Sequence, residues 1–195
     1  MRVIAGKYRG RNLKSPPSLE VRPTSDRLRE TLFNVITPRI KGTRFLDLCA
    51  GSGAVGIEAL SRGAKHVTFV DRSRRMCLLV KSNLDLCKIE ANENEVVLAE
   101  AHDYLRRVTA KPSGSADSKN ELQWDIVFFD PPYASDYFPT LDFLGSHSSY
   151  LLTETGLLIV EHHHKNKLQD DLGRIIRSRT LKQGDSALSF YQVTR

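Results

Sequence analysis

The chain has 195 residues and a formal net charge of +6, with 40% hydrophobic and 27% charged residues. These values are ordinary for a soluble globular protein and fit one domain with a sizeable core. No apolar run approaches the roughly 20 residues of a membrane span, and the first residues lack the apolar region of a secretory signal. The three cysteines form no C-x-x-C pair, which argues against a disulfide framework and a metal cluster. We expect a cytoplasmic protein without a metal.

The basic charge is concentrated near the N-terminus. Residues 1–44 contain 11 Lys and Arg against 3 Asp and Glu, whereas residues 45–195 contain 18 against 20. Such asymmetry favours a nucleic-acid-facing arm on a near-neutral domain, although a solvated basic surface is the alternative. Because the cations of residues 2–14 are interleaved with glycines and Tyr8, we predict a basic β-hairpin that contacts a polyanion.

Strands and helices alternate along the rest of the chain. After a Pro-rich loop, a helix capped by Thr24 or Ser25 is predicted over 26–36, with Arg27, Arg29, Glu30 and Asn34 on its outer face and Pro38 at its end. Further helices are predicted at 54–60, 73–87, 104–108, 138–152 and 168–172. Strands are predicted at 44–48, 66–70, 96–99, 125–129, 156–160, 174–181 and 187–193, and the last two are predicted to form a hairpin. Residues 109–123 are polar and predicted to form an exposed loop.

This alternation predicts a doubly wound α/β fold. We expect a seven-stranded, mostly parallel sheet with helices on both faces. The predicted organisation is a basic extension over residues 1–23 followed by one domain over residues 24–195.

A glycine-rich turn follows the first predicted strand. Residues 51–56 read G-x-G-x-x-G, and Asp71 lies twenty residues after Gly51; this is the fingerprint of a dinucleotide site. Glycines let the backbone approach a ligand, and the Asp71 carboxylate can accept hydrogen bonds from both hydroxyls of the ligand's ribose. However, Asp47 at the end of the strand would oppose a pyrophosphate, whereas it suits the cationic amino group and sulfonium of S-adenosylmethionine. A capping or solvated turn acid is the alternative for Asp47.

The strand predicted at 125–129 stops abruptly at Asp130-Pro131-Pro132-Tyr133. Ligands of open α/β sheets bind beyond the carboxyl ends of strands, and two prolines make the turn rigid. A carboxylate, a carbonyl and a ring in such a turn suit a flat substrate with an exocyclic amine. The alternative is a strand that simply ends in a Pro-rich turn.

Residues 47–53 and 130–133 resemble the cofactor and catalytic motifs of class I S-adenosylmethionine-dependent amino-methyltransferases. Residues 22–34 (RPTSDRLRETLFN), with residues 4–11, 56–64 and 184–191, resemble the bacterial methyltransferases that modify guanine N2 in small-subunit (16S) ribosomal RNA. The resemblance spans nearly the whole chain except residues 109–123. It implies a Rossmann-like fold, S-adenosylmethionine as cofactor, and ribosomal RNA or an assembling subunit as partner. Alternatives are an N6-adenine or N4-cytosine methyltransferase, an NAD-dependent oxidoreductase and a non-catalytic RNA-binding module.

The resemblance also implies roles for individual residues. The implied catalytic residues are Asp130, Pro131, Pro132 and Tyr133. The implied cofactor-binding residues are Asp47, Ala50, Gly51, Ser52, Gly53, Asp71, Arg72, Glu100, Ala101 and Arg27. The expected RNA-binding residues are Arg2, Lys7, Arg9, Arg11, Lys14 and Arg22. Glu100 departs from the usual Asp or Asn of the family, so His102 and Asp103 are alternatives. Arg27 and Glu30 could instead form a surface pair on their helix.

Two further sequence features could be taken for a metal site and a nucleophile, and we predict neither role. The run Glu161-His162-His163-His164 suggests a metal site, but only alternate residues of an extended backbone share a face, and no H-x-x-x-H motif is present. Cys49 lies beside the glycine-rich turn, where we interpret it as a small buried thiol and not as a nucleophile.

Overall fold

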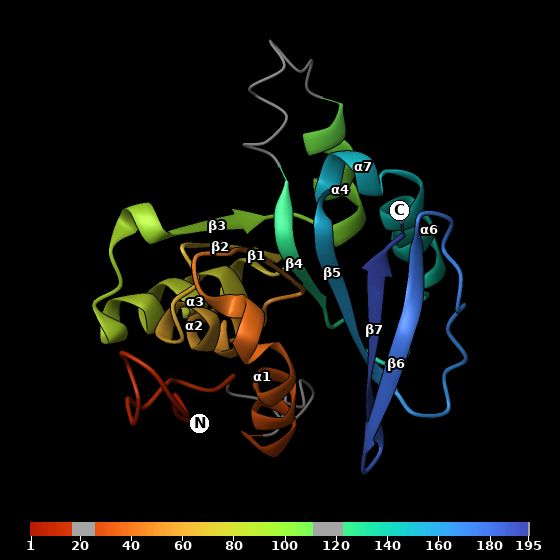
Figure 1. Cartoon of the computed structure of the whole chain (residues 1–195). Helices are drawn as coiled ribbons and strands as arrows, with labels where there is room; N and C mark the ends of the chain where they lie inside the picture. Colours follow the sequence, from red (N-terminus) through yellow and green to blue (C-terminus); the bar gives the residue numbers. More distant parts are fainter. Residues whose placement is uncertain (17–25, 111–122, 195) are drawn as a thin grey trace. The chain divides into compact units, whose positions relative to one another are not determined.

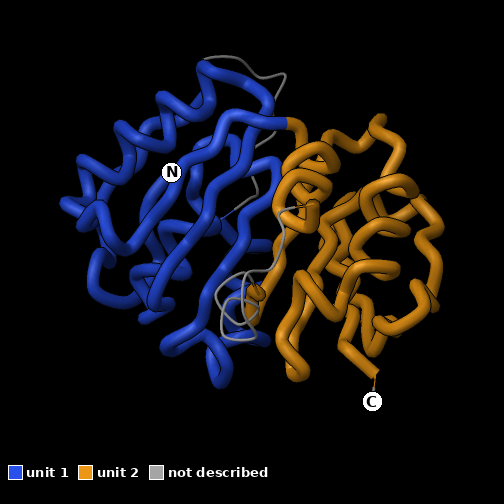
Figure 2. Tube along the Cα trace, turned by 90° about the horizontal axis from the view of Figure 1, so that it is seen from above, with its two compact units in different colours: residues 1–99 blue, residues 100–195 orange. Residues whose placement is uncertain are grey.

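The structure, a computed structural model, describes residues 1–16, 26–110 and 123–194. The chain divides into two compact units, residues 1–99 and residues 100–195 (Figure 2). Several predictions fall outside the described residues: the domain boundary after residue 23, Arg22, the cap at Thr24 or Ser25, and most of the 109–123 loop.

The first unit contains a parallel three-stranded sheet in the order β3-β2-β1. Its strands are β1 (Arg44–Leu48), β2 (His66–Asp71) and β3 (Asn94–Leu98), and its α-helices are α1 (Asp26–Ile40), α2 (Ala54–Ser61) and α3 (Arg74–Cys87). A short 3-10 turn (Ala91–Glu93) leads into β3. Helices α2 and α3 lie along one face of the sheet (Figure 1), as expected where a helical crossover joins parallel strands.

Helix α1 is longer than predicted. The prediction that Pro38 ends it is wrong, because the helix continues to Ile40. Pro38 lies in the last turn, where its ring removes one helical hydrogen bond, and the burial of Ile40, which is 2% exposed, offsets that loss. The prediction that Arg29 lies on the outer face is also wrong: its side chain is fully buried.

Residues 1–16, here called the N-terminal segment, form a short antiparallel hairpin, in which Val3 N–H donates to Arg11 O at 3.0 Å and Leu13 N–H donates to Met1 O at 2.9 Å. One isolated antiparallel bridge joins Arg2 and Asn12, and Gly6 and Gly10 turn the chain, both with φ of 82°. The inward side chains Val3, Tyr8 and Leu13 are buried.

Polar groups of α2 anchor the N-terminal segment. The Glu58 carboxylate accepts hydrogen bonds from the N–H groups of Ile4 and Ala5, at 2.7 and 3.0 Å. The Ser61 carbonyl accepts the N–H of Lys7 at 2.7 Å. These bonds satisfy the backbone donors of Ile4, Ala5 and Lys7, and they attach the segment to α2.

The second unit contains a mixed sheet in the order β4-β5-β7-β6. Its strands are β4 (Trp124–Phe129), β5 (Leu152–His163), β6 (Ile175–Gln183) and β7 (Ser186–Val193), and its described helices are α4 (Ala101–Thr109), α6 (Phe138–Ser146) and α7 (Ser148–Leu151). The pairing of β4 with β5 is parallel, whereas β7 pairs antiparallel with both β5 and β6. The predicted closing hairpin is therefore confirmed, and all seven predicted strands are present, three in one unit and four in the other.

One predicted helix of the second unit is absent. Residues 168–172 are not helical; Asp171 forms an isolated bridge with Ile176, and Leu172 N–H donates to Ile175 O at 3.0 Å. Gly173, with φ of 88°, supplies the left-handed turn that reverses the chain there. Across the residues that the structure describes, no helix combines the length and apolarity needed to cross a membrane.

Candidate functional site

The turn between β1 and α2, residues 49–53, is here called the glycine loop. Cys49, Gly51 and Gly53 have positive φ angles of 66°, 54° and 76°. Cys49 adopts this conformation despite its side chain, at a cost of about 1 kcal/mol or more. Backbone bonds hold the loop: Gly53 N–H donates to Ala50 O at 2.7 Å, and Ala50 N–H donates to Val70 O at 3.0 Å.

Gly51 and Gly56 are glycines for different structural reasons. A Cβ atom on Gly56 would lie 2.2 Å from Cε1 of Phe69, so this glycine is required for α2 to pack on β2. A Cβ atom on Gly51 would meet nothing within 4 Å. The space beside Gly51 therefore suits a ligand that approaches the backbone, whereas Gly56 serves the fold.

Asp47 lies at the end of β1 and is 2% exposed. Its Oδ2 atom accepts a hydrogen bond from Gly56 N–H at 3.0 Å, so it caps the start of α2 as the alternative interpretation predicted. Burial raises the pKa of Asp47 to about 7, which the hydrogen bond from Gly56 opposes and the nearby negative charge of Asp71 reinforces. A cation beside Asp47 would restore its negative charge at neutral pH.

Asp71, at the end of β2, joins the glycine loop to the start of α3. Its Oδ2 accepts the N–H of Gly51 at 2.9 Å, and its Oδ1 accepts the N–H of Ser73 at 2.8 Å. The structure thus brings Asp47, the glycine loop and Asp71 together in the first unit. The next residue, Arg72, is exposed.

Residues 130–133, here called the Asp130 turn, follow β4 in the second unit. Pro131 is buried, whereas Asp130 and Tyr133 are partly exposed. The hydroxyl of Tyr133 shares a hydrogen bond of 2.5 Å with Ser186 Oγ at the start of β7. The Tyr133 ring also meets the His163 ring edge-to-face, with centroids 5.6 Å apart. Side chains from the ends of β5 and β7 therefore fix the orientation of this ring.

Sequence reasoning missed three neighbours of the Asp130 turn. Asn166 Nδ2 donates to the Tyr133 carbonyl at 3.4 Å, and Ser186 holds the Tyr133 hydroxyl. Tyr137 is buried beside the turn, and its pKa is raised by burial and then by the negative charge of Asp130. Ser186 lies within the stretch 184–191 that carries the family resemblance, so a signal for it was present; nothing in the local sequence indicates Asn166.

The remaining cofactor candidates are spread over other elements. Glu100 is exposed and directly precedes α4, while Ala101 is the buried first residue of that helix. Both belong to the second unit, whereas the glycine loop belongs to the first. Arg27 is exposed on α1. Their roles stay predictions.

Most of the predicted RNA-binding cations lie on the outer side of the N-terminal segment. Arg2, Lys7, Arg9 and Lys14 are exposed. Lys14 Nζ donates to Ser82 Oγ at 2.7 Å, and the half-buried Arg11 donates to the Leu86 carbonyl at 3.1 Å.

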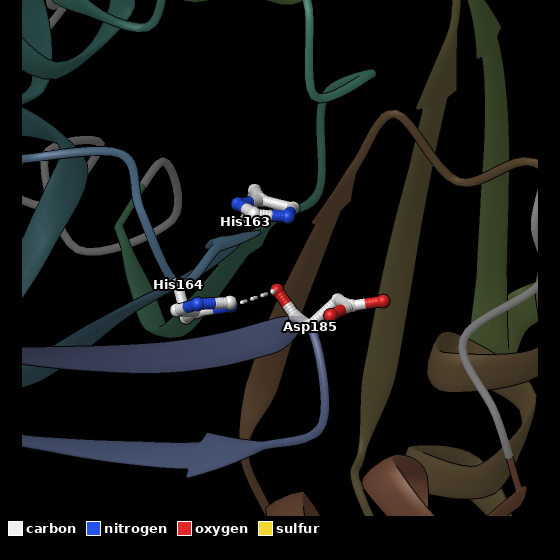
Figure 3. A group of neighbouring side chains, drawn as sticks. All are labelled: His163, His164 and Asp185. Carbon is white, nitrogen blue, oxygen red and sulfur yellow. Dashed lines mark hydrogen bonds between the residues drawn. The ribbon is translucent and has the colours of Figure 1, made fainter.

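The histidine run places one group of potential metal ligands in the second unit. The ligand atoms of His163, His164 and Asp185 lie within 4.8 Å of one another (Figure 3). The two rings are stacked with centroids 4.7 Å apart; His164 Nδ1 bonds the Asp185 carbonyl at 3.1 Å, and His163 Nδ1 accepts the N–H of Lys165 at 3.2 Å. His162 is buried and bonds Ser189. One nitrogen of each stacked ring is thus used in protein contacts, and the expectation of no metal stays a prediction.

Residues 1–192 match the model of a protein family described as conserved hypothetical protein 95. The chain belongs to this family. YlbH of Bacillus subtilis, named as a candidate rRNA methyltransferase, is 35% identical over 192 residues, 98% of each chain. Ribosomal RNA small subunit methyltransferase D of Escherichia coli is 35% identical over 168 residues, 86% of this chain and 77% of that protein. The solved structure of yhhF from Escherichia coli aligns with a TM-score of 0.80 at 33% identity, over 99% of this chain and 97% of that chain.

These likenesses confirm the family that the sequence motifs predicted. They also confirm the Rossmann-like α/β fold of class I methyltransferases. Family membership gives no support to the NAD-dependent oxidoreductase that the G-x-G-x-x-G spacing left open.

Proposed function

We propose that this protein transfers a methyl group from S-adenosylmethionine to the exocyclic N2 amine of a guanine in small-subunit (16S) ribosomal RNA. The observation that carries the proposal is the Asp130 turn: a carboxylate and the Pro131 carbonyl end a buried strand next to a tyrosine ring of fixed orientation. Membership of a family with relatives named rRNA methyltransferases supports the same reaction.

We assign the methyl donor to the first unit. The cationic amino group of the cofactor pairs with Asp47, the open space at Gly51 admits the ligand beside Ala50, Ser52 and Gly53, and Asp71 binds the ribose hydroxyls. Arg27 and Arg72 of the same unit are further candidates for contacts, and the roles of Glu100 and Ala101 stay predictions. The sulfonium of the cofactor supplies an activated methyl group, so the protein's task is to bind and orient.

We assign the acceptor base to the second unit. An aromatic amine is a poor nucleophile because its lone pair is delocalised into the ring. Asp130 and the Pro131 carbonyl accept hydrogen bonds from this amine and orient its nitrogen, and the carboxylate stabilises the positive charge that develops during transfer. Tyr133 stacks on a base splayed out of its helix, which contributes about 1–3 kcal/mol.

We assign the RNA phosphates to the exposed cations of the N-terminal segment, chiefly Lys7 and Arg9. Ribosomal RNA, free or in an assembling small subunit, is the proposed partner, and the cytoplasm is the proposed location.

Two measurements test the proposal. Calorimetry should detect binding of S-adenosylmethionine and none of NAD. The protein should then transfer a labelled methyl group to unmodified small-subunit RNA or to assembling subunits. Binding of NAD in place of S-adenosylmethionine, or RNA binding without methyl transfer to either substrate, would refute the proposed reaction.

A further inference from the structure

Tyr137 carries a buried hydroxyl beside the Asp130 turn. The residue is 6% exposed and directly precedes α6, where its carbonyl accepts the N–H of Leu141 at 3.0 Å. Its ring meets the ring of Phe129 edge-to-face, with centroids 6.1 Å apart. Because Phe129 is the last residue of β4, this contact fixes the tyrosine next to the strand end from which the Asp130 turn begins.

The Tyr137 hydroxyl has no hydrogen-bond partner among the residues that the structure describes. Buried polar groups are nearly always paired, because an unpaired group has lost its hydration without compensation. Two other tyrosine hydroxyls of the second unit are paired: Tyr133 with Ser186 Oγ at 2.5 Å, and the buried Tyr191 with the Gln169 carbonyl at 2.7 Å. The hydroxyl of Tyr137 therefore has capacity for an acceptor that a ligand could supply.

The surroundings of this hydroxyl keep it protonated. Burial raises the pKa of Tyr137 above its ordinary value, and the negative charge of the nearby Asp130 carboxylate raises it further. The Asn166 side chain opposes this shift as a hydrogen-bond donor, and a donor cannot accept the hydrogen of the hydroxyl. Tyr137 thus presents an O–H donor next to the carboxylate to which we assign the target amine.

We propose that Tyr137 donates a hydrogen bond to N3 of the target guanine. The inference rests on the proposed function and adds a second contact to the acceptor base. The exocyclic amine is attached to C2, whose ring neighbours are N1 and N3. N1 carries a hydrogen, whereas N3 carries a lone pair, so N3 is the ring acceptor next to the amine. With Asp130 on the amine and Tyr137 on N3, two contacts along one edge fix the rotation of the base in its plane.

Methylation kinetics with a modified RNA test this contact. 3-Deazaguanine has a C–H group in place of N3 and keeps the N2 amine. With guanine at the methylated position, Tyr137→Phe should lower kcat/KM by about tenfold. With 3-deazaguanine there, the variant should stay within about twofold of the wild type, because one hydrogen bond can be lost only once. If this RNA is not methylated, its inhibition constant against the guanine RNA gives the same comparison.

Tyr150→Phe is the matched control, because it removes the hydroxyl of an exposed tyrosine on α7. Its kinetics should equal those of the wild type with both RNAs. Thermal unfolding supplies a readout that a purely structural role would move. Tyr137→Phe removes an unpaired buried hydroxyl and keeps the ring, so the variant should unfold at the same temperature as the wild type or at a higher one.

The outcomes separate this contact from the proposed function. Unchanged kinetics of Tyr137→Phe with guanine RNA would overturn the contact, and so would losses of equal size with guanine and 3-deazaguanine. A clearly lower unfolding temperature of Tyr137→Phe would show that the fold itself uses the hydroxyl, which also overturns it. Failure of the wild type to methylate guanine in the unmodified RNA would instead overturn the proposed function.

Discussion

The glycine loop and the Asp130 turn both follow buried strands, but the protein holds their acidic groups differently. Asp47 and Asp71 accept backbone N–H groups of their own unit and so belong to the fold as well as to the proposed ligand site. The Asp130 turn is partly exposed, and its ring is held by the side chain of Ser186. Substitutions near the glycine loop should therefore change stability and ligand binding together, whereas those in the Asp130 turn should change turnover with little effect on stability.

The largest effect is expected for Asp130→Ala. Losing the carboxylate that orients the amine and stabilises its developing charge should reduce turnover by about 10²- to 10³-fold or more. Calorimetry should show cofactor affinity within about threefold of wild type, and thermal unfolding should be nearly unchanged. Asp142→Ala, which removes an exposed acid of α6, is the matched control. Near-normal methylation by Asp130→Ala would show that Asp130 does not bind and orient the target amine.

Asp47→Asn should weaken cofactor binding by about 10- to 100-fold, because the buried partner of the cationic amino group is lost. The same change should stabilise the free protein above neutral pH. In the folded state Asp47 keeps its proton up to about pH 7, whereas the unfolded chain releases it near the ordinary value of 3.8. Stability of the wild type therefore falls as pH rises from about 4 to about 7. Asparagine can still accept the Gly56 N–H and avoids that loss.

Urea unfolding of the wild type and of Asp47→Asn at several pH values measures the difference in their free energies of unfolding. The advantage of Asp47→Asn should be small near pH 4, grow up to about pH 7 and level off above it. For the wild type, cofactor affinity should rise over the same upper range, since binding of a cation requires the ionised acid. An asparagine variant that is less stable than wild type at pH 8 would show that Asp47 serves the fold as an anion.

Ser186→Ala should have a smaller effect, of about three- to tenfold on turnover, because the Tyr133 ring remains but loses the bond that fixes its orientation. Ser186→Thr, which keeps a hydroxyl, should recover much of the activity. Steady-state kinetics with Tyr133→Phe and the double variant test the coupling. Since one hydrogen bond joins the two residues, the double variant should be no worse than Tyr133→Phe alone; additive losses would place Ser186 in a separate role.

The smallest effect per substitution is expected for the cations of the N-terminal segment, and it should appear in RNA binding. Lys7→Gln and Arg9→Gln should weaken RNA binding modestly and lower the slope of log affinity against log salt by about one per cation. Lys182→Gln, on exposed β6, is the control. Deleting the segment would be less informative, because Glu58 and Ser61 would lose their backbone partners. An unchanged salt slope would contradict the RNA-binding role.

Local patterns predicted most of the fold. The strand over 44–48 was predicted to the residue, because a short, mainly apolar segment directly before a glycine-rich turn indicates a buried strand in an alternating α/β chain. Arg29 was misplaced because helical periodicity identifies one buried face of α1, and the N-terminal segment covers another. The prediction of a helix over 168–172 was wrong because Gly173 and hydrogen bonds to β6 reverse the chain there.

The candidate site was predictable where its residues lie within one motif. Asp47, the glycine loop and Asp71 are joined by bonds across at most twenty positions, and their spacing is visible in the sequence. Ser186 and Tyr133 are 53 positions apart, and Arg29 reaches the carbonyl of a residue 27 positions before it. Such pairs depend on the folded chain, so no local spacing indicates them.

The most direct test is mass spectrometry of small-subunit RNA methylated by this protein with isotopically labelled S-adenosylmethionine. After digestion to nucleosides, the label should appear in N2-methylguanosine, and it should be absent when Asp130→Ala replaces the wild type. Label in N6-methyladenosine or N4-methylcytidine, or no label in RNA that the protein binds, would contradict guanine N2 methylation.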